Sequence, residues 1–149
     1  MAALARSVAF ALLLVVVAGQ AAQAQTTAEV ARKWGLVGTW RLDCVQPRSQ
    51  SNPDLNYVVR DGKLFHDRNF GNNQDSSAVM TAVVKADKSL EIVVKFDSLK
   101  QTRQFALMKG PDGRIRAVSN RNVDTNEYSI RDGKFTANGG TPPWQTRCR

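Results

Sequence analysis

Residues 90–96 read Leu90-Glu91-Ile92-Val93-Val94-Lys95-Phe96 and form the clearest strand pattern in the chain. Side chains alternate between the two faces of an extended backbone. The four residues Leu90, Ile92, Val94 and Phe96 therefore share one face. This stretch predicts a strand that buries one side.

The same pattern continues outward in both directions. Two Asp-Gly pairs, Asp61-Gly62 and Asp132-Gly133, separate alternating runs, and Asp-Gly is a strong signal for a tight β-hairpin. Longer polar connections are expected at 46–55 and 70–77. Eight further strands are predicted, one of which could be merged or absent: 39–45, 56–60, 63–69, 78–85, 102–109, 114–120, 126–131 and 144–148.

One short helix is expected before the first strand. Thr26 and Glu29 have the spacing of a capping box. Val30 and Trp34 would share a helix face, and Gly35 could end the helix. After Gly38 no long stretch keeps helical spacing, so the fold class is all-β.

The first 24 residues have the layout of a secretory signal peptide. Arg6 is followed by an apolar run at 8–18 and by Ala22-Gln23-Ala24, a small-x-small cleavage site. The 11-residue run is shorter than the roughly 20 residues that span a bilayer. We therefore expect 1–24 to be removed, 25–149 to form one domain without membrane insertion, and the product to be periplasmic or secreted.

Cys44 and Cys148 are the two cysteines of the chain. Since an exported compartment is oxidising, we expect one disulfide between them. It would close almost the whole domain and place the first and last strands side by side. Two free thiols or a redox pair is the alternative.

Antiparallel strands joined by tight turns form a meander, which leaves two exposed edges. Closure into a barrel pairs those edges and agrees with a bond between Cys44 and Cys148. The prediction is an antiparallel up-and-down β-barrel of about eight strands with a short N-terminal helix. A two-sheet sandwich with the same bridge is the alternative.

Gly38-Thr39-Trp40, which follows the short helix, resembles the Gly-x-Trp signature of lipocalins and the wider calycin group. Residues 124–128 loosely resemble that family's Thr-Asp-Tyr turn. The resemblance implies an eight-stranded barrel whose N-terminal segment covers one end and whose cup holds a small apolar ligand. It also implies a basic residue over the Trp40 indole, for which Arg147 and Arg149 are candidates.

A barrel of this size has an interior that is either filled by side chains or holds one small ligand, and the sequence leaves both open. Large residues on the apolar side of their strands would line that interior. The predicted ligand-binding residues are Trp40, Tyr57, Phe96, Phe105 and Tyr128.

Catalytic and metal-binding patterns are missing from the sequence. His66 is the one histidine, and Asp67 beside it would point to the opposite face of a strand. No cluster of metal ligands and no nucleophile motif occurs. We therefore expect no enzyme activity and no cofactor.

The charge balance is basic. Beyond Arg6 the chain holds 20 Lys and Arg against 13 Asp and Glu. They are dispersed without interleaved aromatic residues, so nucleic acid is not the expected partner. A polyanionic surface is an alternative partner, with two local patches available: Arg114, Arg116 and Arg121, and Lys95, Lys100 and Arg103.

Two functions remain open at this stage. The first is a lipocalin-like binding protein for a small apolar or amphipathic ligand. The second is a barrel that docks on another exported protein, similar to periplasmic protease inhibitors, although the cysteines of those inhibitors lie much closer together than Cys44 and Cys148. A free arm at 25–30 would favour the inhibitor, whereas an arm packed across the barrel would favour ligand binding.

Overall fold

The computed structural model describes residues 25–149, so the predicted signal peptide at 1–24 lies outside the described residues. One helix precedes a series of strands, and a single 3-10 turn, η1 (Asp97–Leu99), follows the fifth strand. The elements are α1 (Thr27–Trp34), β1 (Gly38–Arg41), β2 (Asp54–Arg60), β3 (Lys63–Asn69), β4 (Gln74–Val84), β5 (Leu90–Phe96), β6 (Gln101–Lys109), β7 (Ile115–Asn122), β8 (Tyr128–Arg131), β9 (Lys134–Phe135) and β10 (Thr146–Cys148).

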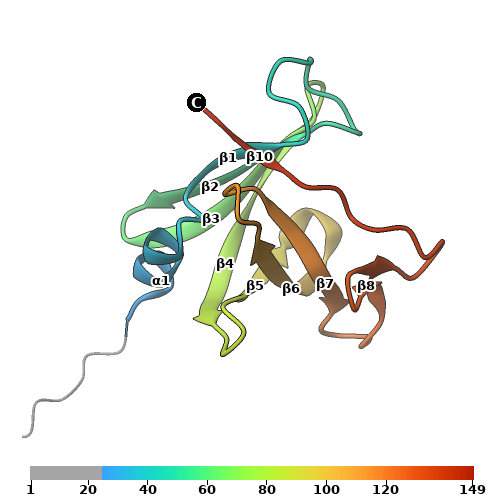
Figure 1. Ribbon diagram of the computed structural model, residues 1–149. Coiled ribbons are helices and arrows are strands. Elements are labelled where there is room, and N and C mark those ends of the chain that lie inside the picture. The colour runs from blue at the N-terminus through green and yellow to red at the C-terminus, as the bar shows by residue number, and fades with distance from the viewer. Residues whose placement is uncertain (1–24) are drawn as a thin grey trace, which may run out of the picture.

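All ten strands belong to one antiparallel sheet, in the order β10-β1-β2-β3-β4-β5-β6-β7-β8-β9. The sheet curls around its apolar face, and α1 covers one end of it (Figure 1). The predicted all-β class, antiparallel pairing and N-terminal helix are therefore confirmed.

The predicted closed barrel of about eight strands is wrong, because the edge strands β9 and β10 do not pair. The segment 136–145 runs between them as a strap (Figure 1). It contains Gly139-Gly140 and Pro142-Pro143, and proline lacks the N–H that a ladder needs. At its end, Gln145 bridges to Ile115 of β7 through two backbone hydrogen bonds of 3.0 and 2.7 Å.

The predicted strand boundaries are close for the central strands. Strands 63–69 and 90–96 have the expected limits, and both residues of each Asp-Gly turn have positive φ. β4 begins earlier than expected, inside the stretch 70–77 that was predicted as a connection. β9 has only two residues and was missed.

The helix forms as the sequence predicts. Thr26 is its N-cap and exchanges hydrogen bonds with Glu29, and Gly35 ends it with a φ of 89°. Its buried face consists of Ala28, Ala31 and Trp34, and the Trp34 indole donates to the Lys88 carbonyl at 2.9 Å. α1 therefore closes the end of the sheet where β4 turns into β5, called the closed end below.

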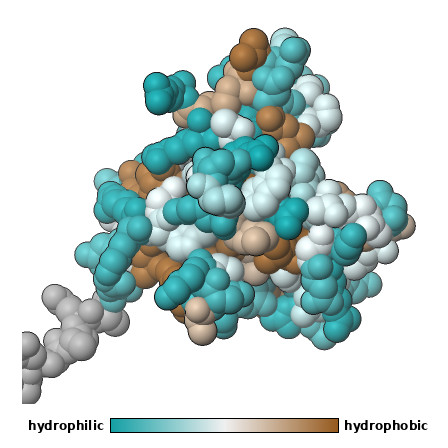
Figure 2. All heavy atoms as spheres, in the orientation of Figure 1, coloured by the Kyte–Doolittle hydropathy of each residue, from teal (hydrophilic) through white to brown (hydrophobic). Residues whose placement is uncertain are grey.

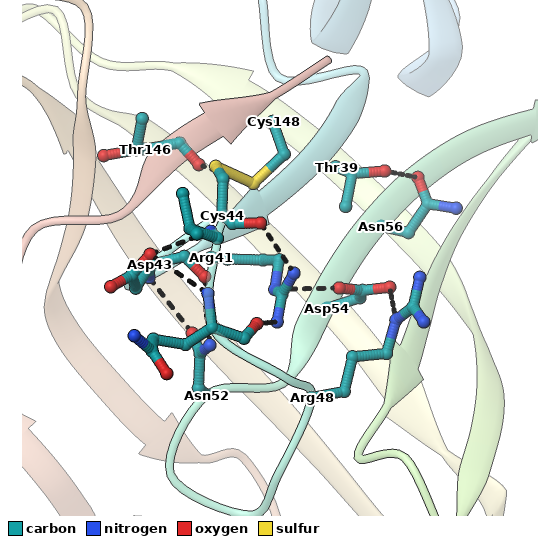
Figure 3. The surroundings of a disulfide bond; sticks show 12 residues. Thr39, Arg41, Asp43, Cys44, Arg48, Asn52, Asp54, Asn56, Thr146 and Cys148 are labelled. Carbon is teal, nitrogen blue, oxygen red and sulfur yellow. Dashed lines mark hydrogen bonds and ion pairs between the residues drawn. A yellow bond between two sulfur atoms is a disulfide. The ribbon is translucent and has the colours of Figure 1, made fainter.

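The predicted disulfide between Cys44 and Cys148 is confirmed. It joins residues 104 positions apart, with 5.6 Å between the Cα atoms. Cys44 lies in the bend that follows β1, and Cys148 lies in β10 beside it (Figure 3). β1 ends at Arg41, short of the predicted residue 45.

A buried arginine explains why β1 ends there. The Arg41 side chain is 9% exposed and donates to the carbonyls of Cys44 and Gln46, at 3.3 and 2.6 Å. These contacts fold residues 42–46 back over the guanidinium instead of extending the strand. Arg41 Nε also forms an ion pair of 3.1 Å with Asp54, outside hydrogen-bond geometry.

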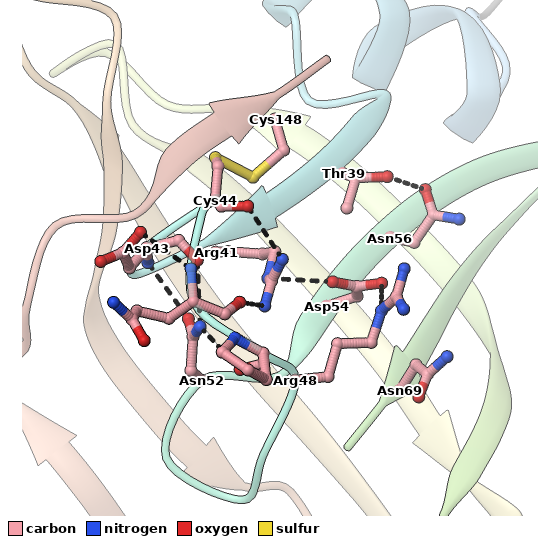
Figure 4. Close-up of polar contacts among 12 residues, drawn as sticks. Thr39, Arg41, Asp43, Cys44, Arg48, Asn52, Asp54, Asn56, Asn69 and Cys148 are labelled. Carbon is pink, nitrogen blue, oxygen red and sulfur yellow. Dashed lines mark hydrogen bonds and ion pairs between the residues drawn. A yellow bond between two sulfur atoms is a disulfide. The ribbon is translucent and has the colours of Figure 1, made fainter. Parts of the chain in front are cut away.

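Arg41 belongs to a group of four polar residues that we call the polar cluster (Figure 4). Its members are Arg41, Arg48, Asn52 and Asp54. The second Asp54 oxygen accepts from Arg48 Nε at 2.5 Å. The Asn52 amide accepts from the Asp43 N–H and donates to the Asp43 and Pro47 carbonyls. The polar cluster and the disulfide therefore hold the same segment.

The surface in Figure 2 is mostly hydrophilic, with small separate hydrophobic areas. Within the described part of the chain no helix is long and apolar enough to cross a membrane. The exposed large hydrophobic residues are scattered over several elements: Leu42, Val45, Met80, Val83, Val84, Leu99 and Val123.

Candidate functional site

The inner face of the sheet changes from apolar to polar along the strands. Lys109, at the end of β6, donates to the Trp34 carbonyl, so this end of β6 lies at α1. Moving away from α1 on the same face, Leu107 is 5% exposed, Phe105 is half-buried, and Arg103 follows. The closed end is thus packed with apolar side chains, and the opposite end, called the open end, is polar.

β3 repeats this gradient. Leu64 is 1% exposed and His66 is 4% exposed, and the half-buried Arg68 follows on the same face. Tight packing at the closed end includes Leu36, Leu64, Leu90, Ile92 and Ile115, all at most 1% exposed.

A cavity of about 500 Å³ occupies the open half of the interior. This volume lies within the usual range for small-molecule sites, about 300–1,000 Å³. The interior is therefore filled by side chains at the closed end and hollow at the open end. The lining residues are Leu55, Tyr57, His66, Arg68, Phe96, Leu99, Gln101, Arg103, Phe105, Leu107, Ala117, Asn120, Ser129, Ile130, Phe135, Pro142, Pro143 and Gln145.

Three of the five predicted ligand-binding residues, Tyr57, Phe96 and Phe105, line this cavity. The Phe96 and Phe105 rings meet edge to face with centroids 6.2 Å apart. Trp40 and Tyr128 do not line it. A binding role for these five residues stays a prediction.

Tyr128 lies outside the cavity because a bulge interrupts the alternation of β8. Arg121 pairs with Tyr128 whereas Asn120 pairs with Ile130, so one extra residue, Ser129, lies between the two pairs. Ser129 and Ile130 consequently both line the cavity. The Tyr128 ring instead lies in a surface groove, 5.1 Å from the Arg131 guanidinium.

Trp40 lies among the packed residues of the core, 2% exposed, and its indole donates to the Leu36 carbonyl at 2.7 Å. Of the two basic candidates, Arg147 approaches it: the guanidinium carbon is 6.0 Å from the ring centroid and Nη2 donates to the Val37 carbonyl at 2.6 Å. A Cβ on Gly38 would lie 2.7 Å from Arg147 Nε. Glycine at this position thus leaves room for the arginine.

His66 is the most unusual polar group in the cavity wall. Its ring stacks on Tyr57 with centroids 4.5 Å apart, and it meets the edge of Phe96 at 5.9 Å. Burial and then the charge of Arg68 lower the pKa of His66 to about 3. The imidazole is therefore neutral at physiological pH, and its Nδ1 has no hydrogen-bond partner among residues 25–149.

His66 makes stability depend on pH. In the unfolded chain the His66 imidazole takes up a proton near pH 6.5, whereas in the folded protein it does so only near pH 3. The free energy of unfolding therefore falls as the pH drops through this window. The slope is up to about 1.4 kcal/mol per pH unit. His66→Phe, which keeps an aromatic ring against Tyr57, is expected to lose about 1.6 kcal/mol less than the unaltered protein between pH 6.5 and pH 5, because the slope reaches its full value only below the unfolded pKa.

Urea unfolding at each pH measures this difference. Hydrogen bonds from Arg60 and Arg68 are the chief reason why the pKa values of Asp67 and Asp75 are lowered. These carboxyl groups therefore change the stability only near and below pH 4, and they are present in both proteins. Parallel stability curves between pH 6.5 and pH 5 would contradict a neutral buried His66.

Arg68 and Arg103 are the two charged residues that line the cavity. The Arg68 guanidinium pairs with Asp75, with Nε 2.8 Å from Oδ1, and lies 4.5 Å from the Phe96 centroid. Arg103 donates only to neutral oxygens, those of Asn120, Gln101 and Ser129.

Arg103 was predicted as part of a surface patch with Lys95 and Lys100, but it lines the cavity. Arg103 lies two residues before Phe105 and four before Leu107, so strand alternation alone predicts that it shares their inner face. In the other predicted patch, Arg114 and Arg116 lie 5.9 and 4.5 Å from the Trp144 ring. Arg121 instead bonds to Gln104.

The polar groups of the cavity are donors and acceptors fixed by the sheet, together with one neutral imidazole. Within residues 25–149 no group of three or more His, Cys, Asp or Glu side chains is placed to hold a metal ion.

Comparisons with protein-family models, with curated proteins and with solved structures yield no match for this chain. The lipocalin-like resemblance therefore rests on the residues of this chain alone.

Proposed function

We propose that this protein is an exported, lipocalin-like binding protein for a small amphipathic molecule. The observation that carries the proposal is the cavity of about 500 Å³, which combines an apolar wall with a few polar groups. This combination is typical of small-molecule sites. The disulfide between Cys44 and Cys148 agrees with export, since disulfides persist in oxidising compartments.

The position of the N-terminal segment supports ligand binding over inhibition of a protease. Ala28 and Ala31 are 2% and 0% exposed, and α1 packs against β3 and β4. The segment that an inhibitor would present as a free arm thus helps to cover the closed end. Its packing leaves the open end for a ligand.

Binding of N-phenyl-1-naphthylamine, an uncharged apolar fluorophore, tests the proposal. We expect saturable binding with a rise in fluorescence. Ala117→Phe, which places a ring in the cavity wall, is expected to weaken this binding about tenfold or more, equivalent to at least about 1.4 kcal/mol.

Val118→Phe is the matched control, because Val118 is the next residue on β7 and lines the surface groove instead of the cavity. It should leave the affinity unchanged. Absence of saturable binding, or equal binding by both variants, would overturn the proposed function.

A further inference from the structure

Arg103 is held by the cavity wall without a counter-ion. Its Nε donates to Asn120 Oδ1 at 2.7 Å, Nη1 to Gln101 Oε1 at 3.1 Å and Nη2 to Ser129 Oγ at 3.0 Å. All three acceptors are neutral, and among residues 25–149 no carboxylate lies within ion-pair distance of Arg103. The positive charge is therefore positioned but not neutralised.

The charge balance of the cavity is one-sided. Two arginines line it, whereas its lining contains neither Asp nor Glu. Asp75 neutralises Arg68, so one positive charge remains, on Arg103. Partial burial lowers the pKa of Arg103, because desolvation disfavours the charged form, although arginine stays charged in proteins.

Hydrogen-bond capacity remains at the same place. A guanidinium has five N–H donors, and Arg103 uses three of them. The two that remain are one on Nη1 and one on Nη2, and such a pair can bind both oxygens of a carboxylate. His66 Nδ1, buried in the same wall, adds a second polar group without a partner in the described chain.

The position of Arg103 fixes the direction of a ligand. Leu107, Phe105 and Arg103 follow one another along the inner face of β6 from the closed end outward. An apolar body would pack against Phe105 and Phe96, and an acidic head would reach Arg103 near the open end.

Building on the proposed function, we propose that the cavity binds an acidic amphiphile, a molecule with an apolar body and a carboxylate that pairs with Arg103. Decanoate is the model for this class, and decan-1-ol is its uncharged counterpart with the same chain length. Each is used to displace N-phenyl-1-naphthylamine from the purified protein at neutral pH.

In the unaltered protein, decanoate is expected to displace the fluorophore at a concentration about tenfold or more below that of decan-1-ol, since charge-assisted hydrogen bonds to the half-buried Arg103 are stronger than those to a neutral hydroxyl. Arg103→Gln should remove this preference, which is read against the variant's own affinity for the uncharged fluorophore. Fluorophore binding thus also reports whether the variant keeps its cavity.

Arg121→Gln is the matched control. Arg121 lies on the outer face of the same strand pair, where it donates to Gln104 and Asn126, both neutral. It removes the same charge from the protein but should keep the preference for decanoate.

The outcomes separate the two proposals. Equal displacement by decanoate and decan-1-ol overturns the acidic head and leaves the binding function standing. Loss of the preference in Arg121→Gln to the same degree as in Arg103→Gln overturns the assignment to Arg103. If neither the fluorophore nor either decyl compound binds, both proposals fail. The comparison on the unaltered protein is valid even if Arg103→Gln does not fold.

Discussion

Replacing Cys44 and Cys148 together by serine is expected to lower the free energy of unfolding by up to about 4.7 kcal/mol, the chain-entropy value for a loop of about 100 residues. The bond joins residues 104 positions apart and closes nearly the whole domain. Its removal lets the unfolded chain expand and releases the bend at Cys44 from β10.

Urea unfolding followed by tryptophan fluorescence measures this loss. The slope of free energy against urea should also increase, because the unfolded chain without the bond exposes more surface. The unaltered protein in a reducing buffer should match the double variant. A loss below about 1 kcal/mol would contradict the role assigned to the bond.

Asp54→Asn is expected to destabilise the protein by about 3 to 5 kcal/mol, the usual cost of breaking a buried ion pair from one side. The Arg41 and Asp54 side chains are 9% and 13% exposed, so solvent screens their interaction little. The amide keeps the shape of the carboxylate but leaves Arg41 charged and buried. Chemical denaturation at neutral pH measures the loss.

Asp97→Asn is the matched control for this change. Asp97 pairs with Lys95 at 3.4 Å, but their side chains are 78% and 60% exposed. An exposed pair contributes at most about 1 kcal/mol. Similar losses in the two variants would show that the polar cluster does not depend on the Asp54 charge.

The local elements of this fold were predictable because each has its own signal. The capping box at Thr26 and Glu29, the Asp-Gly turns and the alternation at 90–96 all act over a few residues. Closure failed as a prediction because it depends on 136–145, where two prolines prevent a ladder. The early end of β1 was equally hidden, since it follows from bonds between Arg41 and carbonyls beyond the strand.

The cavity wall could be predicted only in part. Strand alternation predicts correctly that Tyr57, Phe96 and Phe105 face the interior, because their strands run without interruption at these residues. It failed for Tyr128, where the bulge at Ser129 changes which side chains face inward. The role of Arg103 depends on three acceptors from β6, β7 and β8, which no local pattern brings together.

The strap at 136–145 forms part of the cavity wall although it belongs to none of the ten strands. Pro142, Pro143 and Gln145 line the cavity from a segment anchored by the bridge at Ile115 and by the disulfide of β10. Lengthening a surface connection costs little free energy, since closure entropy grows slowly with length. Insertions between Ala137 and Thr141 are therefore expected to change the size of the cavity while the strands keep their register. This segment is where changes to ligand preference can be engineered without altering the sheet.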